Sequence, residues 1–190
     1  MARTWFSTLP TDAAARWAAI RGFTHAWGLP TAPLPTEAAL DAAAERLGGM
    51  PAALREVYRV FGAGAEALSG QDGWEPLEAL TRRPDGRVVI RRENQSCEAW
   101  AVALDPADPP VIELGADRTS CPTLTEFVVQ VLLLERGFTG WASVHGSVDD
   151  GWAARADAAM SRVPVSETYW VCTPLRIWEG PGAVLWTTES

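Results

Sequence analysis

The stretch that decides the fold is Glu98-Ala99-Trp100-Ala101-Val102-Ala103-Leu104. Large apolar side chains alternate with alanines, which is the period of a β-strand. Trp100, Val102 and Leu104 fall on one face, and the alanines fall on the other. Because both faces are apolar, we expect this strand to be central in its sheet, with helices close against the alanine face.

Apolar spacing, caps and stop residues on either side of this strand predict the remaining elements. Helices are expected over 12–27, between Thr36 and Gly48, from Pro51 to Gly62, over 124–136 and over 151–162. Strands are expected over 88–90, 110–114 and 141–145, followed by a hairpin that pairs 168–178 with 183–188 around the turn 179–182.

The order of these elements predicts an α+β fold, with a mainly antiparallel sheet, N-terminal helices and a late helix packed on it. Thr123 and Glu126 form a capping box before the late helix, 124–136. Apolar residues surround most of the circumference of that helix, so we expect it to be deeply buried. The 190 residues are expected to form one domain that ends in a helix and hairpin over 137–190, and residues 1–30 belong to the core or form an appended helix.

The charge of the chain limits its partners. The net charge is -8, and all 16 basic residues are arginines. An acidic surface repels phosphates, so direct nucleic-acid binding is not expected, whereas a basic protein would be attracted. The alternative interpretation is that the acidity serves solubility alone.

The cysteines, the N-terminus and the apolar runs indicate the cellular compartment of the protein. Three cysteines without a C-x-x-C pair favour reduced thiols, and the N-terminus lacks the features of a signal peptide. The longest apolar run, 127–134, is too short to span a bilayer. We therefore expect a cytoplasmic protein that does not enter the membrane.

The residues that usually carry catalysis are sparse. Only two histidines occur, and neither has a nucleophile or metal ligand at a recognisable spacing. The tight carboxylate groups Asp105…Asp108 and Asp149-Asp150 do not form a calcium loop, and the first is typical of a turn. No enzyme activity, metal or cofactor is expected. Ten tryptophans leave one alternative, a small-molecule pocket lined by tryptophan.

The segment before and into the central strand is Glu93-Asn94-Gln95-Ser96-Cys97-Glu98-Ala99-Trp100. Its polar residues lie between two apolar strands, where Asn and Gln shape turns and satisfy backbone groups. This segment resembles the signature of the SUKH superfamily, which contains fungal cell-wall-synthesis regulators and bacterial immunity proteins. Ser96 stands where that signature usually has Gly, so either the turn avoids positive φ or Ser96 is strained.

Other parts of the chain extend the resemblance over residues 36–136. Asp108-Pro109-Pro110-Val111 is similar to the family's Asp-Pro-Pro-Val, and Met50 to Tyr58 and Thr123 to Phe127 are similar to two of its helices. The signature residues with an expected structural role are Glu93, Asn94, Gln95, Trp100, Pro109 and Pro110.

The resemblance implies a non-catalytic protein-binding module, and most directly an immunity protein that neutralises a toxin domain such as a nuclease. A basic toxin would complement the acidic chain. The candidate contact residues are Asp105, Asp108, Glu113, Asp117, Asp149, Asp150 and Trp152. A regulatory or scaffolding protein without a toxin partner, like the fungal members, is the alternative.

Overall fold

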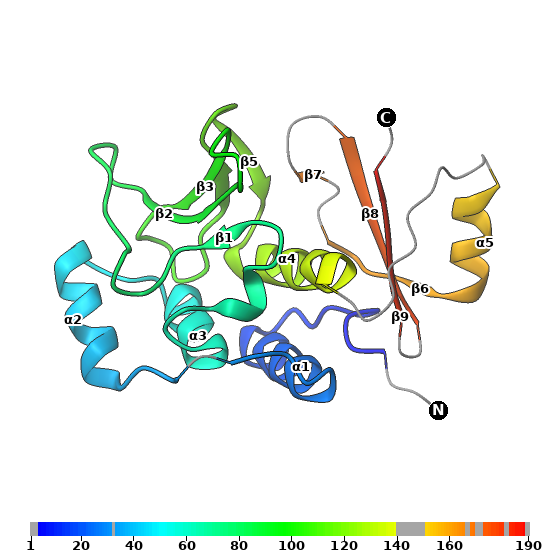
Figure 1. Cartoon of the computed structure of the whole chain (residues 1–190), viewed down its shortest axis with the longest axis horizontal. Helices are drawn as coiled ribbons and strands as arrows, with labels where there is room; N and C mark the ends of the chain where they lie inside the picture. Colours follow the sequence, from blue (N-terminus) through cyan, green and yellow to red (C-terminus); the bar gives the residue numbers. More distant parts are fainter. Residues whose placement is uncertain are drawn as a thin grey trace.

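The computed structural model describes residues 4–31, 33–139, 151–165, 168–169, 173–180 and 183–188. Within these residues the chain has the expected α+β class (Figure 1). The helices are α1 (Ala13–Ala26), α2 (Glu37–Leu47), α3 (Ala52–Phe61), the 3-10 helix η1 (Glu66–Leu68), α4 (Leu124–Thr139) and α5 (Trp152–Ala159). The strands are β1 (Gly73–Trp74), β2 (Val88–Arg92), β3 (Ala99–Val102), β4 (Val111–Glu113), β5 (Arg118–Cys121), β6 (Ser161–Arg162), β7 (Thr168–Tyr169), β8 (Thr173–Gly180) and β9 (Ala183–Thr188).

Side-chain caps set the helix boundaries where the sequence predicted them. The Thr36 hydroxyl accepts a hydrogen bond from Ala39 N at 3.2 Å, and Gly48 ends α2 with φ of +77°. At the start of α4, Thr123 Oγ1 accepts from the Glu126 amide at 3.2 Å. These bonds satisfy amides that lack a partner within the helix, so local sequence fixes where each helix begins.

The first sheet has the strand order β1-β2-β3-β4-β5 and is antiparallel throughout. The decisive strand, β3, is central as predicted. The expectation that helices lie against its alanine face is wrong. Trp100 points to the helical side, where its ring centroid lies 6.0 Å from that of Phe127 in α4. A large indole fills the space between sheet and helix, and this packing decides the orientation.

The C-terminal strands form a second antiparallel sheet, which corrects the prediction of a single sheet. In this sheet β8 pairs with β9 from Leu175↔Thr188 to Gly180↔Ala183, which confirms the predicted hairpin, although Glu179 and Gly180 belong to β8 and not to the turn. Residues 168–169 are not the start of β8. They form the separate strand β7, which folds back on β8. The predicted strand 141–145 lies outside the described residues.

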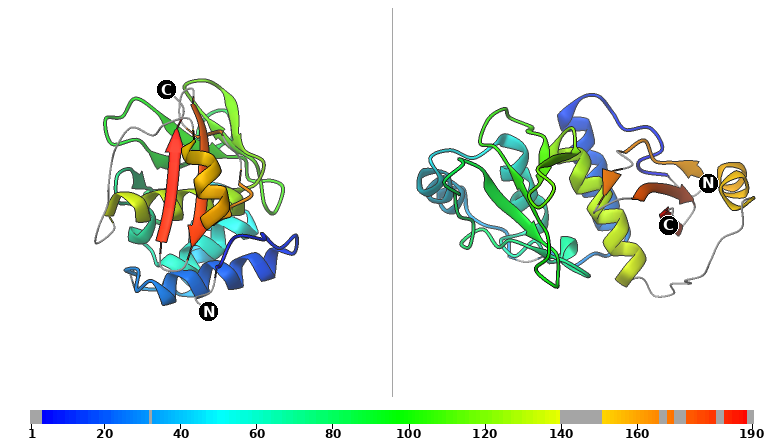
Figure 2. Two further views of the ribbon diagram at one scale, coloured as in Figure 1. Left: turned by 90° about the vertical axis from the view of Figure 1, so that its right-hand side faces the viewer. Right: turned by 90° about the horizontal axis from the view of Figure 1, so that it is seen from above.

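Helix α4 runs between the two sheets (Figures 1 and 2). Residues 127–133 are all 0% exposed, and they include Gln130, whose Oε1 lies 3.3 Å from Cys121 Sγ. A helix covered by sheets on two sides needs apolar residues around its whole circumference, as the sequence of α4 has. None of the described helices combines the length and apolar character that a bilayer crossing requires.

The N-terminal segment packs into the same core. Ile20 and Phe23 of α1 are fully buried there, together with Phe6. The buried Glu179 carboxylate in β8 accepts hydrogen bonds from the amides of Trp5 and Phe6 at 2.7 Å each. These contacts join the start of the chain to the second sheet.

Candidate partner-binding groove

The Glu93–Trp100 segment builds a turn through its own backbone. The buried Glu93 carboxylate accepts hydrogen bonds from Gln95 N at 2.9 Å and Cys97 N at 3.1 Å. Glu93 N donates to the carbonyl of Glu98 at 3.0 Å. Ser96 adopts φ of +62°, the left-handed conformation that suits Gly. The signature residues therefore shape the entry to β3.

Behind this turn lies a cluster of buried charges, which we call the buried ion cluster: Asp72, Arg91 and Glu135. Arg91 in β2 is fully buried, lies 3.2 Å from Asp72 Oδ2 and also pairs with Glu135 of α4. The Arg91 guanidinium carbon lies 5.9 Å from the Trp100 ring centroid, and Asp72 Oδ1 accepts from Asn94 N at 3.3 Å. The cluster joins the signature turn to the first sheet and to α4.

The acidic candidate residues near the strand ends differ in their exposure and in their partners. Glu113 is only 1% exposed and pairs with Arg118 at 2.9 Å, so it is not a surface residue. Asp117 is exposed, has φ of +45° and pairs with Arg87 at 2.7 Å. Asp105 is exposed on the β3–β4 loop. Asp149 and Asp150 lie outside the described residues.

Trp152 holds α5 to the second sheet. Its ring meets that of Trp178 in β8 edge-on, with centroids 5.4 Å apart and an interplanar angle of 86°. The indole N–H of Trp178 donates to Asp157 of α5 at 2.7 Å. Trp152 is half-buried.

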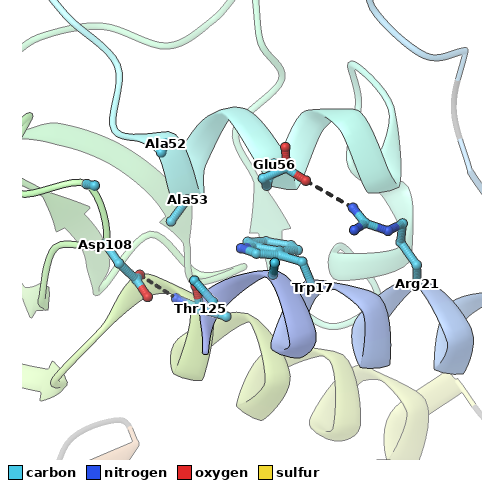
Figure 3. Close-up of a pocket in the computed structure, with 10 residues that line it drawn as sticks. Trp17, Arg21, Ala52, Ala53, Glu56, Asp108 and Thr125 are labelled. Carbon is cyan, nitrogen blue, oxygen red and sulfur yellow. Dashed lines mark hydrogen bonds and ion pairs between the residues drawn. The ribbon is translucent and has the colours of Figure 1, made fainter. Parts of the chain in front are cut away.

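Asp108 is the candidate residue that borders a hollow. A groove of about 360 Å³ lies between α1 and α3 and ends at the β3–β4 loop and the start of α4 (Figure 3). Its walls are largely small and apolar, because alanines begin both α1 and α3. The residues that line it are Ala13, Ala14, Trp17, Arg21, Ala52, Ala53, Glu56, Ala107, Asp108 and Thr125.

Hydrogen bonds fix the two ends of the groove. At one end, Asp108 Oδ1 accepts from Thr125 N at 2.9 Å, and the carbonyl of Ala107 accepts from Ala53 N at 2.9 Å. At the other end, Arg21 Nη1 lies 3.0 Å from Glu56 Oε2 and bridges α1 to α3. The loop that carries Asp108 is thus attached to two helices.

Beyond Glu56 the charges continue across α3 and α2, and we call this set the surface ion network: Arg21, Glu37, Asp41, Arg55, Glu56 and Arg59. Arg59 pairs with Glu37 at 2.6 Å and with Glu56 at 2.7 Å. The hydrogen bond from Arg59 lowers the pKa of Glu37, and the same bond raises the pKa of Arg59. The network therefore favours the ionised form of Glu37.

Within the described part of the chain, no group of three or more His, Cys, Asp or Glu side chains is placed to hold a metal ion. Of the described tryptophans, only Trp17 lines the groove, whereas Trp74, Trp100 and Trp178 are buried in packing contacts. This groove is therefore not the Trp-lined pocket considered from composition.

Sequence reasoning found Asp108 but missed the rest of the groove and the buried ion cluster. Alanines carry no chemical signal, so a groove made by Ala13, Ala14, Ala52 and Ala53 is invisible until the helices are placed. The buried ion cluster did leave a signal, because Arg91 follows three apolar residues and Glu135 ends an apolar run. A charge in such a run indicates a buried partner.

The chain matches no protein-family model, no curated protein and no solved structure in the comparisons made with each.

Proposed function

We propose that this chain is a non-catalytic protein-binding module of the cytoplasm, and that its partner is a basic toxin domain which it neutralises. The observation that carries the proposal is the groove between α1 and α3, an open hollow on an acidic protein with the carboxylates of Asp108 and Glu56 on its rim. Small apolar walls with charged ends suit the side chains of a second protein. The net charge of -8 would speed the encounter with a basic partner.

The resemblance of Glu93–Trp100 to the SUKH signature supports the same proposal by a separate route. In this chain the Glu93 carboxylate and the Trp100 ring are engaged in the turn and beside the buried ion cluster, whereas Asn94 and Gln95 take part through their backbone amides and are exposed. The described contacts of these residues account for the fold. The proposal therefore assigns binding to the groove and its rim, not to the signature.

The proposal is tested by isolating the tagged chain from its native host and identifying the protein that accompanies it. The pair is then reconstituted from purified components, and the partner is expressed in a bacterial host with and without the chain. We expect a stable complex with a basic protein whose expression stops growth, and restored growth when the chain is present.

Two other results would change the account. A stable partner that does not harm the host would favour the regulatory alternative. Failure of the purified proteins to associate, or continued growth arrest despite stoichiometric amounts of the chain, would overturn the immunity proposal.

A further inference from the structure

One polar atom in the groove lacks the partner that its burial calls for. Thr125 in the first turn of α4 is 0% exposed, and among the described residues its Oγ1 makes no hydrogen bond. A buried hydroxyl without a partner is costly, and native structures contain few of them. Thr125 also lines the groove, where Figure 3 shows it beside Asp108 and near Ala53.

The neighbouring carboxylate offers a second acceptor at the same end. Asp108 is half-buried, and its Oδ1 accepts from Thr125 N at 2.9 Å. A carboxylate has two oxygens and room for about four hydrogen bonds. Asp108 Oδ2 and Thr125 Oγ1 are therefore two acceptors on neighbouring residues at one end of an apolar groove.

Three helices, α1, α3 and α4, begin near this end, and helix N-termini commonly attract anions. In each of these three helices, an amide of the first turn already donates a hydrogen bond to an acceptor in the chain itself. Ala15 N donates to Asp12 Oδ1 at 2.8 Å, Ala53 N to the carbonyl of Ala107, and Thr125 N to Asp108. The carboxylate of Asp108 would repel an added anion, so the end of the groove favours a positively charged donor.

We propose that the groove binds an arginine side chain presented by the partner protein, with its guanidinium at Asp108 Oδ2 and Thr125 Oγ1. This inference rests on the proposed function and names the chemistry that the partner must offer. The alanine walls accommodate the aliphatic stem, and the buried Trp17 indole closes the groove between α1 and α3 (Figure 3). Two carboxylates against the single guanidinium of Arg21 leave the lining negative, which complements the incoming charge.

The other basic side chain fits less well. A lysine ammonium is compact and strongly hydrated, and it lacks the planar fork of a guanidinium. A planar fork can donate to two acceptors at once, and the groove offers two on neighbouring residues. At about 360 Å³ the groove holds an arginine side chain and part of the backbone next to it.

The test is a titration of the full chain, labelled with nitrogen-15, with three blocked tripeptides, Ala-Arg-Ala, Ala-Gln-Ala and Ala-Glu-Ala. With the arginine peptide we expect amide shifts at residues 13–17, 52–56, 107–108 and 125, and an affinity in the millimolar range. Asp108→Asn keeps an oxygen for Thr125 N, so the helix cap is retained while the charge is lost. It should weaken binding about 10-fold.

Thr125→Val is the matched variant for the hydroxyl. It preserves the shape of the side chain and removes only an unsatisfied oxygen, so the chain should fold, and binding should weaken about 3-fold. Asp85→Asn, which removes an exposed acid in the turn before β2, is the control and should leave binding unchanged.

Several results would overturn the inference. They are equal binding of the glutamine peptide, tighter binding of the glutamate peptide, shifts outside the groove, or no shifts at about 10 mM arginine peptide. The inference and the proposed function fail separately. If the native partner binds wild type and Asp108→Asn equally well, the arginine site is wrong while the binding module stands.

Discussion

The buried ion cluster and the surface ion network use the same residue types at similar distances, yet their surroundings differ. Arg91 is 0% exposed and faces Asp72 and Glu135, whereas Arg59 is 38% exposed beside Glu37 and Glu56. Removing one partner from a buried cluster leaves a charge without solvation, while water screens a surface charge that loses its partner. The comparison separates residues that hold the fold from residues that are available for contact with another protein.

Replacement of Arg91 should have the largest effect. Arg91→Met leaves Asp72 and Glu135 buried without their cation, and we expect the free energy of unfolding to fall by about 3–5 kcal/mol. Arg92→Met is the matched control on the next residue, because Arg92 is 54% exposed and pairs with Glu75. It should cost less than about 1 kcal/mol. Urea unfolding measures both, and equal losses would remove the distinction between buried and exposed charges.

The signature turn should give the next largest effect. Glu93→Ala removes the acceptor of two backbone amides, those of Gln95 and Cys97, and we expect a loss of about 2 kcal/mol in the free energy of unfolding. Glu93→Gln keeps one acceptor oxygen and should cost about half as much. Urea unfolding at neutral pH is the measurement. A neutral Glu93→Ala variant would show that the turn does not depend on this carboxylate.

Glu179 is another buried carboxylate, and its contribution to stability should depend on pH. Burial raises the pKa of Glu179 above the usual 4.5, and the amides of Phe6 and Trp5 only partly oppose that shift. Because its pKa is higher in the folded state, the protonated Glu179 carboxyl stabilises the fold. This stabilisation is fully present below pH 4.5 and is lost as pH rises through the folded-state pKa. The stability of wild type relative to Glu179→Gln should therefore fall as pH rises through this window.

Urea unfolding of wild type and Glu179→Gln across this pH range gives the difference directly, because the titration of all other groups cancels. A difference that grows with pH would mean that the amides of residues 5 and 6 stabilise the ionised carboxylate more than burial disfavours it.

The smallest effect should come from the backbone of the signature turn. Ser96 has φ of +62°, which costs a residue with a Cβ about 1–2 kcal/mol. Replacement by Gly removes this cost, but part of the gain is offset by the greater entropy of Gly in the unfolded chain. Ser96→Gly should raise the free energy of unfolding by about 0.5–1 kcal/mol. The reverse change in the tight turn before β2, Gly86→Ser at φ of +85°, should lower it by a similar amount. If Ser96→Gly raised the free energy of unfolding while Gly86→Ser did not lower it, positive φ would not be the common cause of the two effects.

The sequence predicted the elements of this fold better than their packing. Periodicity and caps located α1 to α4 because those signals are local, as the bond from Ala39 N to Thr36 Oγ1 shows. The face of β3 that meets a helix was predicted wrongly, because alternation identifies two faces but not which one a helix covers. Of the second sheet only the β8–β9 hairpin was predicted, because β6 and β7 are each two residues long and pair with β8.

The candidate site was predictable only in part, and the reason is chemical. Asp108 stood out as an acid in a turn, and the groove beside it depends on four alanines from two helices that are far apart in sequence. Glu113 resembled a surface acid in the sequence, but pairing with Arg118 places it in the interior. The sequence predicts that a residue lies at the end of a strand, but it does not predict whether a neighbouring side chain will bury that residue.

We propose that the partner contacts the groove and not the signature turn. Hydrogen exchange of the reconstituted complex, compared with the free chain, tests this most directly. We predict slower exchange at the amides of residues 13–17, 52–56 and 107–108 when the partner is bound, with no change at 93–98. Slower exchange at 93–98 with an unchanged groove would contradict the claim.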